Sequence, residues 1–253
     1  MQPLIDSHCH LDDLRFDQSR VAVLQRAQDA GVTAFIVPAV CRSGWPKLQH
    51  LALDHSSISP AFGLHPWFCN QHSDSDLSLL PQFLADAVAV GECGLDGSDL
   101  CRFDMDSQLH WFQPQLQLAL EHDLPVIVHA FRAVDDVIRE IRQLPGLRGV
   151  IHSFSGSQQQ ADQLVKLGFY LGFGGAVTYP RASRVQGVVK HIPLEKLLIE
   201  TDAPDQSPAA HRGGNNEPAF LIEILAQIAT LRGTDSQALA AICNHNAREL
   251  FRL

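Results

Sequence analysis

Seven polar side chains in this sequence share one position: each lies at or just beyond the carboxyl end of a stretch that resembles a β-strand. They are His8, His10, His65, Glu92, His129, His152 and Asp202. In a parallel barrel the carboxyl ends of the strands meet at one mouth, where the loops build the active site. Histidine and carboxylate are common metal ligands. The shared position therefore predicts a metal site, because packing gives no reason to put a polar residue at the same end every time.

His8 and His10 are separated by one residue. Side chains alternate across a strand, so the two imidazoles share a face and Cys9 points the other way. Two imidazoles on one inward face can bind a single cation. Taken alone, such a short motif also occurs by chance in polar turns, so it gains weight only from the other residues at the mouth.

Two carboxylates complete the set. Glu92 follows the buried run Val88–Gly91, and a bidentate carboxylate there is suited to bridge two cations, although a rim glutamate in water is the plain alternative. Asp202 closes Leu197–Thr201. Alternation places Glu200 on the same face as Asp202 but deeper, where we expect it to support a ligand histidine; a buried ion pair is the alternative.

The elements that must position these residues are eight apolar runs bounded by turn or helix signals. We predict strands at Leu4–Ser7, Ala34–Pro38, Ser59–Gly63, Val88–Gly91, Val126–His129, Gly149–His152, Tyr170–Phe173 and Leu197–Thr201. Stretches of helical period lie between them, most clearly at Arg20–Ala30, Gln108–Glu121, Ala133–Gln143 and Gln158–Leu167. Strands that alternate with helices imply a parallel sheet.

Eight such repeats favour closure into a (β/α)8 barrel, although a doubly wound open sheet predicts the same local pattern. A Pro-, Gly- and Asn-rich loop, Ala203–Pro218, follows the eighth strand and precedes two further helices, Ala219–Arg232 and Ser236–Phe251. A length of 253 residues suits one barrel domain covering residues 1–253, and no linker indicates a second.

Composition indicates a globular protein: 45% of residues are hydrophobic and 19% are charged. The net charge of −9 argues against a broad basic face for duplex DNA, so any nucleic-acid contact must be local. The amino terminus has no signal-peptide pattern, and no apolar run could span a membrane, so we expect a cytoplasmic protein without a membrane partner. Six cysteines without a CxxC pair indicate reduced thiols.

Several reaction classes are excluded by missing motifs. The sequence contains no GxSxG nucleophile elbow, no GxxxxGK[ST] phosphate loop and no GxGxxG fingerprint. Acyl-serine, P-loop and dinucleotide chemistry are therefore not indicated, and a metal-dependent reaction is.

Eight short motifs along the sequence resemble those of a known family. IDSHCHLD, GLHP, VGECGLD, PVIVHAFRA, IHSFSG, YPRAS, ETDAP and NNEP occur in this order along essentially the whole chain. As a set they are similar to the TatD-like metal-dependent deoxyribonucleases of the amidohydrolase superfamily.

The resemblance implies a TIM barrel with a two-metal site. It implies that His8, His10 and Asp202 bind one divalent ion (Mg²⁺, Mn²⁺ or Zn²⁺), that His129 and His152 bind the other, and that Glu92 bridges them. It also implies that His65 contacts substrate at the mouth and is not a metal ligand.

The sequence departs from the family pattern in its loops. His129-Ala130-Phe131-Arg132 stands where the family often has HSR, Asn215 stands where an arginine is common, and Asp205 replaces an apolar residue after Pro204. Arg132, Arg181 and Arg212 lie in loops after strands and are candidates for phosphate contact, with solvated surface arginines as an equal alternative.

The predicted activity is hydrolysis of phosphodiester bonds in single-stranded or frayed DNA, with the ions activating water and Asp202 and Glu92 as the catalytic carboxylates. A small positive pocket in an acidic protein suits single strands. Two alternatives stay open: a barrel hydrolase of another phosphoester, amide or lactone, and a non-catalytic metal-binding protein. No obligatory protein partner is indicated.

Overall fold

The computed structural model describes residues 3–253. Eight strands form one parallel sheet in the order of the chain: β1 (Leu4–Asp6), β2 (Val32–Pro38), β3 (Ile58–Phe62), β4 (Ala89–Asp96), β5 (Val126–Phe131), β6 (Gly149–Ile151), β7 (Tyr170–Phe173) and β8 (Leu197–Ile199). Each strand pairs with the next, from β1 with β2 to β7 with β8. Such an order is that of a barrel and excludes the doubly wound alternative, in which the strand order reverses.

Hydrogen bonds between the first and last strands bring the sheet round on itself. The Ser7 amide donates to the Ile199 carbonyl at 3.1 Å, and the Asp202 amide donates to the His8 carbonyl at 2.9 Å. These contacts continue just beyond the ends of β1 and β8, so the nearly closed sheet is a TIM barrel.

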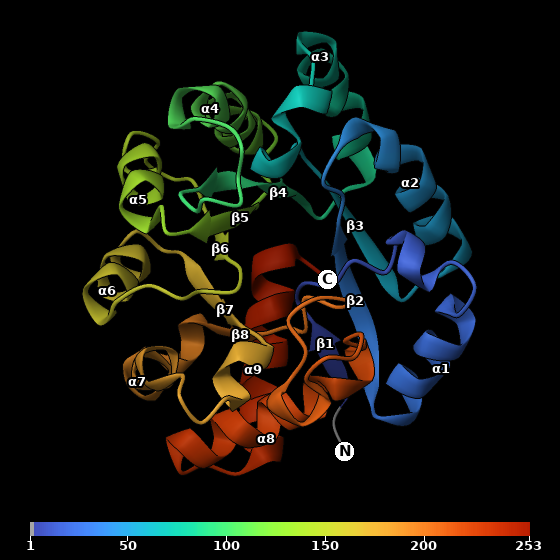
Figure 1. Cartoon of the computed structure of the whole chain (residues 1–253), viewed down its shortest axis with the longest axis vertical. Helices are drawn as coiled ribbons and strands as arrows, with labels where there is room; N and C mark the ends of the chain where they lie inside the picture. The colour runs from blue at the N-terminus through green and yellow to red at the C-terminus, as the bar shows by residue number, and fades with distance from the viewer. Residues whose placement is uncertain (1–2) are drawn as a thin grey trace.

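Helices surround the strands (Figure 1). They are α1 (Arg20–Asp29), α2 (Trp45–Asp54), α3 (Asp74–Phe83), α4 (Met105–Glu121), α5 (Val134–Arg142), α6 (Gln158–Lys166), α7 (Ser183–His191), α8 (Leu221–Arg232) and the additional α9 (Ser236–Phe251). Four of them, α3, α4, α6 and α9, have side-chain caps at their starts. Ser157 and Gln160 form a capping box on α6, and Asp235 accepts from two amides at the start of α9.

The amino-terminal half of the barrel interior is a packed apolar layer. Each strand contributes one inward side chain to it: Ile5, Ile36, Ala61, Ala89, Ile127, Val150, Tyr170 and Leu198. Helix α9 covers this layer with Ala247, Leu250 and Phe251, and in Figure 1 it lies close to the centre of the ring of strands. We call these eleven side chains the barrel floor.

Buried asparagines attach α9 to the barrel. Asn244 accepts from the Ile5 amide at 3.1 Å, and Asn246 donates to the Leu197 carbonyl at 2.8 Å. The additional helix therefore closes the end of the barrel that lies opposite the active-site mouth.

Strand β4 is the clearest difference from the expected elements. The predicted strand Val88–Gly91 is too short, because β4 continues through Glu92 to Asp96. Two glycines interrupt the apolar run, but the strand goes on pairing with β5, with Gly94 opposite His129. A Cβ atom at Gly94, whose φ is +143°, would overlap the His129 carbonyl oxygen. The glycine lets the two backbones approach closely.

All six cysteines are free, as expected. Within residues 3–253, the helices are too short or too polar to cross a bilayer.

Candidate metal centre

Along several strands, the side chains on the inward face of the barrel change from apolar to polar between residue i and residue i+2. Ile127 belongs to the barrel floor, and His129 lies two residues further along the chain. Val150 is followed in the same way by His152, and Leu198 by Glu200. Because residues i and i+2 share a face, strands that fill the floor also carry the polar groups of the mouth.

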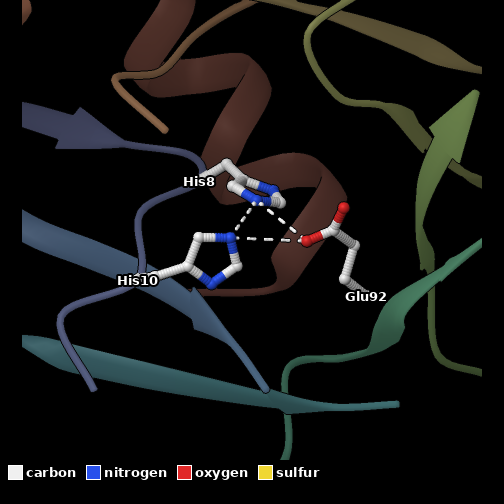
Figure 2. A group of neighbouring side chains, drawn as sticks. All are labelled: His8, His10 and Glu92. Carbon is white, nitrogen blue, oxygen red and sulfur yellow. Dashed lines mark hydrogen bonds and ion pairs between the residues drawn. The ribbon is translucent and has the colours of Figure 1, made fainter. Parts of the chain in front are cut away.

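The first group of side chains comes from β4 and from the segments just after β1 and β8. Figure 2 shows His8, His10 and Glu92 turned toward one another. The Nε2 atoms of His8 and His10 are 3.3 Å apart, and each is 3.4 Å from Glu92 Oε2. Asp202 Oδ1 lies 3.4 Å from His8 Nε2 and 3.5 Å from His10 Nε2.

These spacings fit a bound cation. Ligand bonds of about 2.0–2.2 Å place the corners of a tetrahedron about 3.3–3.6 Å apart. Each of the two imidazole nitrogens lies at that spacing from the other and from both carboxylate oxygens. His8, His10, Glu92 and Asp202 can therefore hold one divalent ion between them.

The second group faces the other oxygen of Glu92. Oε1 lies 2.8 Å from His152 Nε2 and 3.3 Å from His129 Nδ1, and these two nitrogens are 3.3 Å apart. The two oxygens of a single carboxylate thus point at two different sets of imidazoles. Glu92 is positioned to join two ligand sets.

In two of the four ligand histidines, His10 and His129, a hydrogen bond fixes which ring nitrogen faces the centre. His10 Nδ1 is 3.1 Å from the Pro38 carbonyl, and His129 Nε2 is 2.8 Å from Asp96 Oδ2. Since both partners only accept, these nitrogens carry the proton in the neutral ring. The opposite nitrogens then present lone pairs to the centre, as metal-binding histidines require.

Among the ligand histidines, His8 is the one that its surroundings hold in the neutral form. Burial, followed by repulsion from His152, lowers the pKa of His8 to about 4. The two rings are stacked, with centroids 4.0 Å apart and planes 9° apart. A neutral His8 is the form that can bind a cation.

The carboxylates of the centre are held as anions. Burial by itself raises the pKa of Glu92, but attraction to the surrounding imidazoles, His152 first, holds it well below the usual value. For Asp202 burial also acts upward, yet the hydrogen bond with His10 and further histidines bring its pKa to about 2. Burial lowers the pKa values of His10, His129 and His152, but their carboxylate partners outweigh it and raise all three, that of His152 to about 9. A divalent cation bound among these nitrogens would take the place of those protons, and imidazole nitrogens with ionised carboxylates are a donor set that fits divalent cations.

Three buried acids outside the expected ligand set position it. Asp6 Oδ2 accepts from the Thr201 hydroxyl at 2.6 Å and Oδ1 from the Thr201 amide at 3.0 Å, which ties the end of β1 to the segment before Asp202. Burial raises the pKa of Asp6 to about 7. Asp96 orients His129 as described above. Glu200 accepts from the Ser153 amide at 2.5 Å and lies 3.8 Å from His152 Nδ1.

Sequence reasoning named Glu200 but missed Asp6 and Asp96. Alternation gave a signal for Asp96, because Glu92, Gly94 and Asp96 share a face once β4 is known to extend that far. For Asp6 the signal was an acid immediately before the strand-end histidines.

His65 lies against the centre in a different role. Its Nδ1 accepts from the Trp67 amide at 3.1 Å, so the proton of the neutral ring is on Nε2, 3.1 Å from Glu92 Oε1. In this tautomer His65 donates to Glu92 and has no lone pair left for a cation. The interpretation of His65 as a mouth residue stays a prediction that this geometry supports.

A pocket of about 570 Å³ opens over the centre. Its lining includes His65, Glu92 and Asp202 together with loop residues of the mouth. A pocket of this size suits a small ligand or one unit of a polymer.

Arg132, Arg181 and Arg212 are exposed and do not line this pocket. Arg132 instead lies over the Phe131 ring, 5.5 Å from its centroid. The lining arginine is Arg15, between Asp13 at 2.8 Å and Asp205 at 2.7 Å. Contact between substrate and the three predicted arginines stays a prediction, and it requires a substrate that extends beyond the pocket.

A TIM barrel with imidazoles and carboxylates converging at its mouth fits a metal-dependent hydrolase. Comparisons with known proteins agree. The sequence model of the family described as "TatD related DNase" matches residues 5–252. The chain belongs to the TatD family.

Relatives match over nearly their whole lengths. The chain is 40% identical to an uncharacterized metal-dependent hydrolase of Escherichia coli K12, YjjV, over 98% of each sequence. It is 34% identical to YabD of Bacillus subtilis, also named an uncharacterized metal-dependent hydrolase, over 99% of each. The crystal structure of YjjV, a TatD homologue, superposes with a TM-score of 0.92 and 39% identity, over 99% of this chain and 98% of that one.

Proposed function

We propose that this protein is a divalent-metal-dependent deoxyribonuclease that hydrolyses phosphodiester bonds in single-stranded DNA or frayed ends at a two-metal site. The observation that carries the proposal is Glu92, whose two oxygens face two separate histidine groups. His8, His10 and Asp202 would hold one ion and His129 and His152 the other, with Glu92 shared. The family description supports phosphodiester hydrolysis.

When bound, a pair of divalent cations polarises a phosphoryl oxygen and brings the pKa of water toward neutrality. Two such cations bring four positive charges against two from Glu92 and Asp202, so the centre attracts an anionic diester into an acidic protein.

The side chains of the mouth supply the remaining steps. Asp202 is ionised at neutral pH and directs Oδ1 toward the centre, while Gln206 donates to its Oδ2. It can accept the proton of the attacking water and return it to the leaving oxygen. His65 donates to Glu92 and restrains that carboxylate, and the buried surroundings limit competing water.

One observation favours a second candidate, a hydrolase of a smaller phosphoester. Among residues 3–253, the pocket lining includes Arg15 as its one lysine or arginine, and Asp13 and Asp205 already pair with it. The pocket therefore offers a diester the centre itself but few other cationic contacts.

The test is an assay of purified protein with Mg²⁺, Mn²⁺ or Zn²⁺ on end-labelled single-stranded DNA, beside Glu92→Ala. Metal-dependent shortening of the DNA that is lost in the variant supports the nuclease. Turnover of small phosphoesters, amides or lactones alone supports the smaller-substrate hydrolase and contradicts the nuclease. Metal binding without turnover of any substrate supports a non-catalytic metal-binding protein.

A further inference from the structure

One wall of the pocket is apolar and exposed, although the metal centre beside it is polar. Nine large hydrophobic side chains are exposed in the described part of the chain, and three of them, Trp67, Leu100 and Phe131, line this pocket. The other six are aliphatic and none lines the pocket, whereas Trp67 and Phe131 are aromatic. Exposed rings gathered at a concave site indicate a ligand surface.

Trp67 is held in place from two sides. Its indole Nε1 donates to Asp96 Oδ2 at 2.7 Å, and its backbone amide donates to His65 Nδ1 at 3.1 Å. The ring is nevertheless 46% exposed. A fixed ring with a free surface loses little conformational entropy when a ligand packs on it.

Phe131 is next to Asp96 in the pairing of β4 with β5. It is the register partner of Asp96 in the β4–β5 ladder and lies two residues beyond His129 on β5. Asp96 therefore contacts Trp67 and His129 through one oxygen while its backbone pairs with Phe131. The Trp67 ring is thus bonded to the acid that supports His129, and Phe131 is connected to the same acid through the backbone pairing of β4 and β5.

The charges of the pocket limit what can lie on this wall. Arg15 is paired with Asp13 and Asp205, and Asp12 is a further acid in the lining. Within the lining, a second phosphate beside the scissile one would meet carboxylates and no unpaired lysine or arginine, while Arg132 lies outside the lining, over the Phe131 ring. An uncharged group next to the scissile phosphate therefore fits this wall best, and a flat group matches the aromatic surface.

We propose that Trp67 and Phe131 form a stacking subsite that takes one nucleobase adjacent to the scissile phosphodiester. The proposal rests on the proposed phosphodiesterase function and adds the feature that selects its substrate. Stacking of a base on an aromatic side chain strengthens binding by roughly 5- to 150-fold and tolerates different bases.

The test uses metal-loaded protein and three dinucleotides: thymidylyl-thymidine and its two analogues in which one base is replaced by hydrogen. Wild-type protein should prefer the intact dinucleotide to one of the analogues by roughly 10-fold or more in kcat/KM. Trp67→Ala should bring this ratio close to one, and Trp67→Phe should keep most of it. Leu53→Ala, which removes an exposed apolar side chain outside the pocket, should keep the wild-type ratio.

A ratio within one variant does not depend on how much protein is folded or metal-loaded. An unchanged ratio in both Trp67→Ala and Phe131→Ala overturns the subsite, and so does the absence of any preference in wild type.

If wild-type protein cleaves none of the dinucleotides, the proposed function fails, and binding decides the subsite. Calorimetry then compares thymidine 5′-monophosphate with 2-deoxyribose 5-phosphate on the metal-loaded protein. Tighter binding of the nucleotide by roughly 10-fold, lost in Trp67→Ala, supports the subsite. Equal affinities overturn the stacking subsite and favour a partner protein as the ligand of the apolar wall.

Discussion

The floor and the mouth of the barrel are built from the same inward faces, but their side chains differ in kind. At the floor, eight apolar residues, one from each strand, pack under α9. At the mouth, imidazoles and carboxylates are buried at distances that a cation can bridge. On β5, and where the chain continues beyond β6 and β8, the inward face passes from packing side chains to polar side chains within two residues.

Among changes at the floor and the mouth, the largest loss of activity is expected at the mouth. Glu92→Gln keeps the volume of the side chain but removes the charge that joins the two histidine groups. Hydrolysis should fall by roughly 10³-fold, because the ions contribute several kcal/mol to the transition state. The rise in melting temperature that saturating metal gives wild-type protein should also shrink. A variant with near wild-type kcat/KM would contradict the role of Glu92.

The matching change at the floor should do the opposite. Phe251→Ala removes a ring that is 2% exposed under the barrel, so the free energy of unfolding should fall by about 3–5 kcal/mol. The kcat of the folded fraction should stay within about 2-fold, since no floor residue touches the centre. Chemical denaturation and assay of the same preparations measure both quantities, with Phe251→Leu as the milder control. A selective loss of kcat would show that floor and mouth are coupled.

A smaller effect, on metal affinity, is expected when Asp96, which holds His129 in place, is changed. Asp96→Asn leaves His129 without an anionic partner for its Nε2 proton, and metal affinity should fall by about 10- to 100-fold. Metal titration by calorimetry measures this, and Asp99→Asn, an exposed acid three residues further on, is the control. Equal affinities in the two variants would mean that Asp96 does not position His129.

The smallest effect is expected at the exposed arginines. Arg132→Ala, Arg181→Ala and Arg212→Ala should leave kcat/KM on a dinucleotide within about 2-fold, because none of them lines the pocket. On single-stranded DNA long enough to leave the pocket, each loss should be a few-fold and should shrink as salt rises. A large loss on the dinucleotide would place the arginine in contact with the scissile unit.

Strand alternation explains how much the sequence could predict. His129 and His152 end apolar runs on the inward face, so both the barrel and their convergence could be predicted from period and position. Glu92 was placed after a strand when it lies inside β4, because Gly91 and Gly94 break the apolar pattern that marks a strand. Trp67 belongs to no periodic pattern, and the hydrogen bond from its indole to Asp96 is formed only in the folded protein.

Loops limit prediction most. The sequence places Arg132, Arg181 and Arg212 after strands, but the direction of each side chain depends on contacts made elsewhere in the fold. Arg15, in the loop after β1, is the arginine that lines the pocket, where it pairs with Asp205 of another loop. The compartment of the protein likewise stays a prediction.

The most direct test of the metal centre is anomalous diffraction from crystals of the protein loaded with Mn²⁺ or Zn²⁺. The account predicts two peaks about 3.5–4 Å apart on either side of the Glu92 carboxylate, one bound by His8 and His10 and the other by His129 and His152. A single peak, or peaks bound by residues other than these, would contradict it.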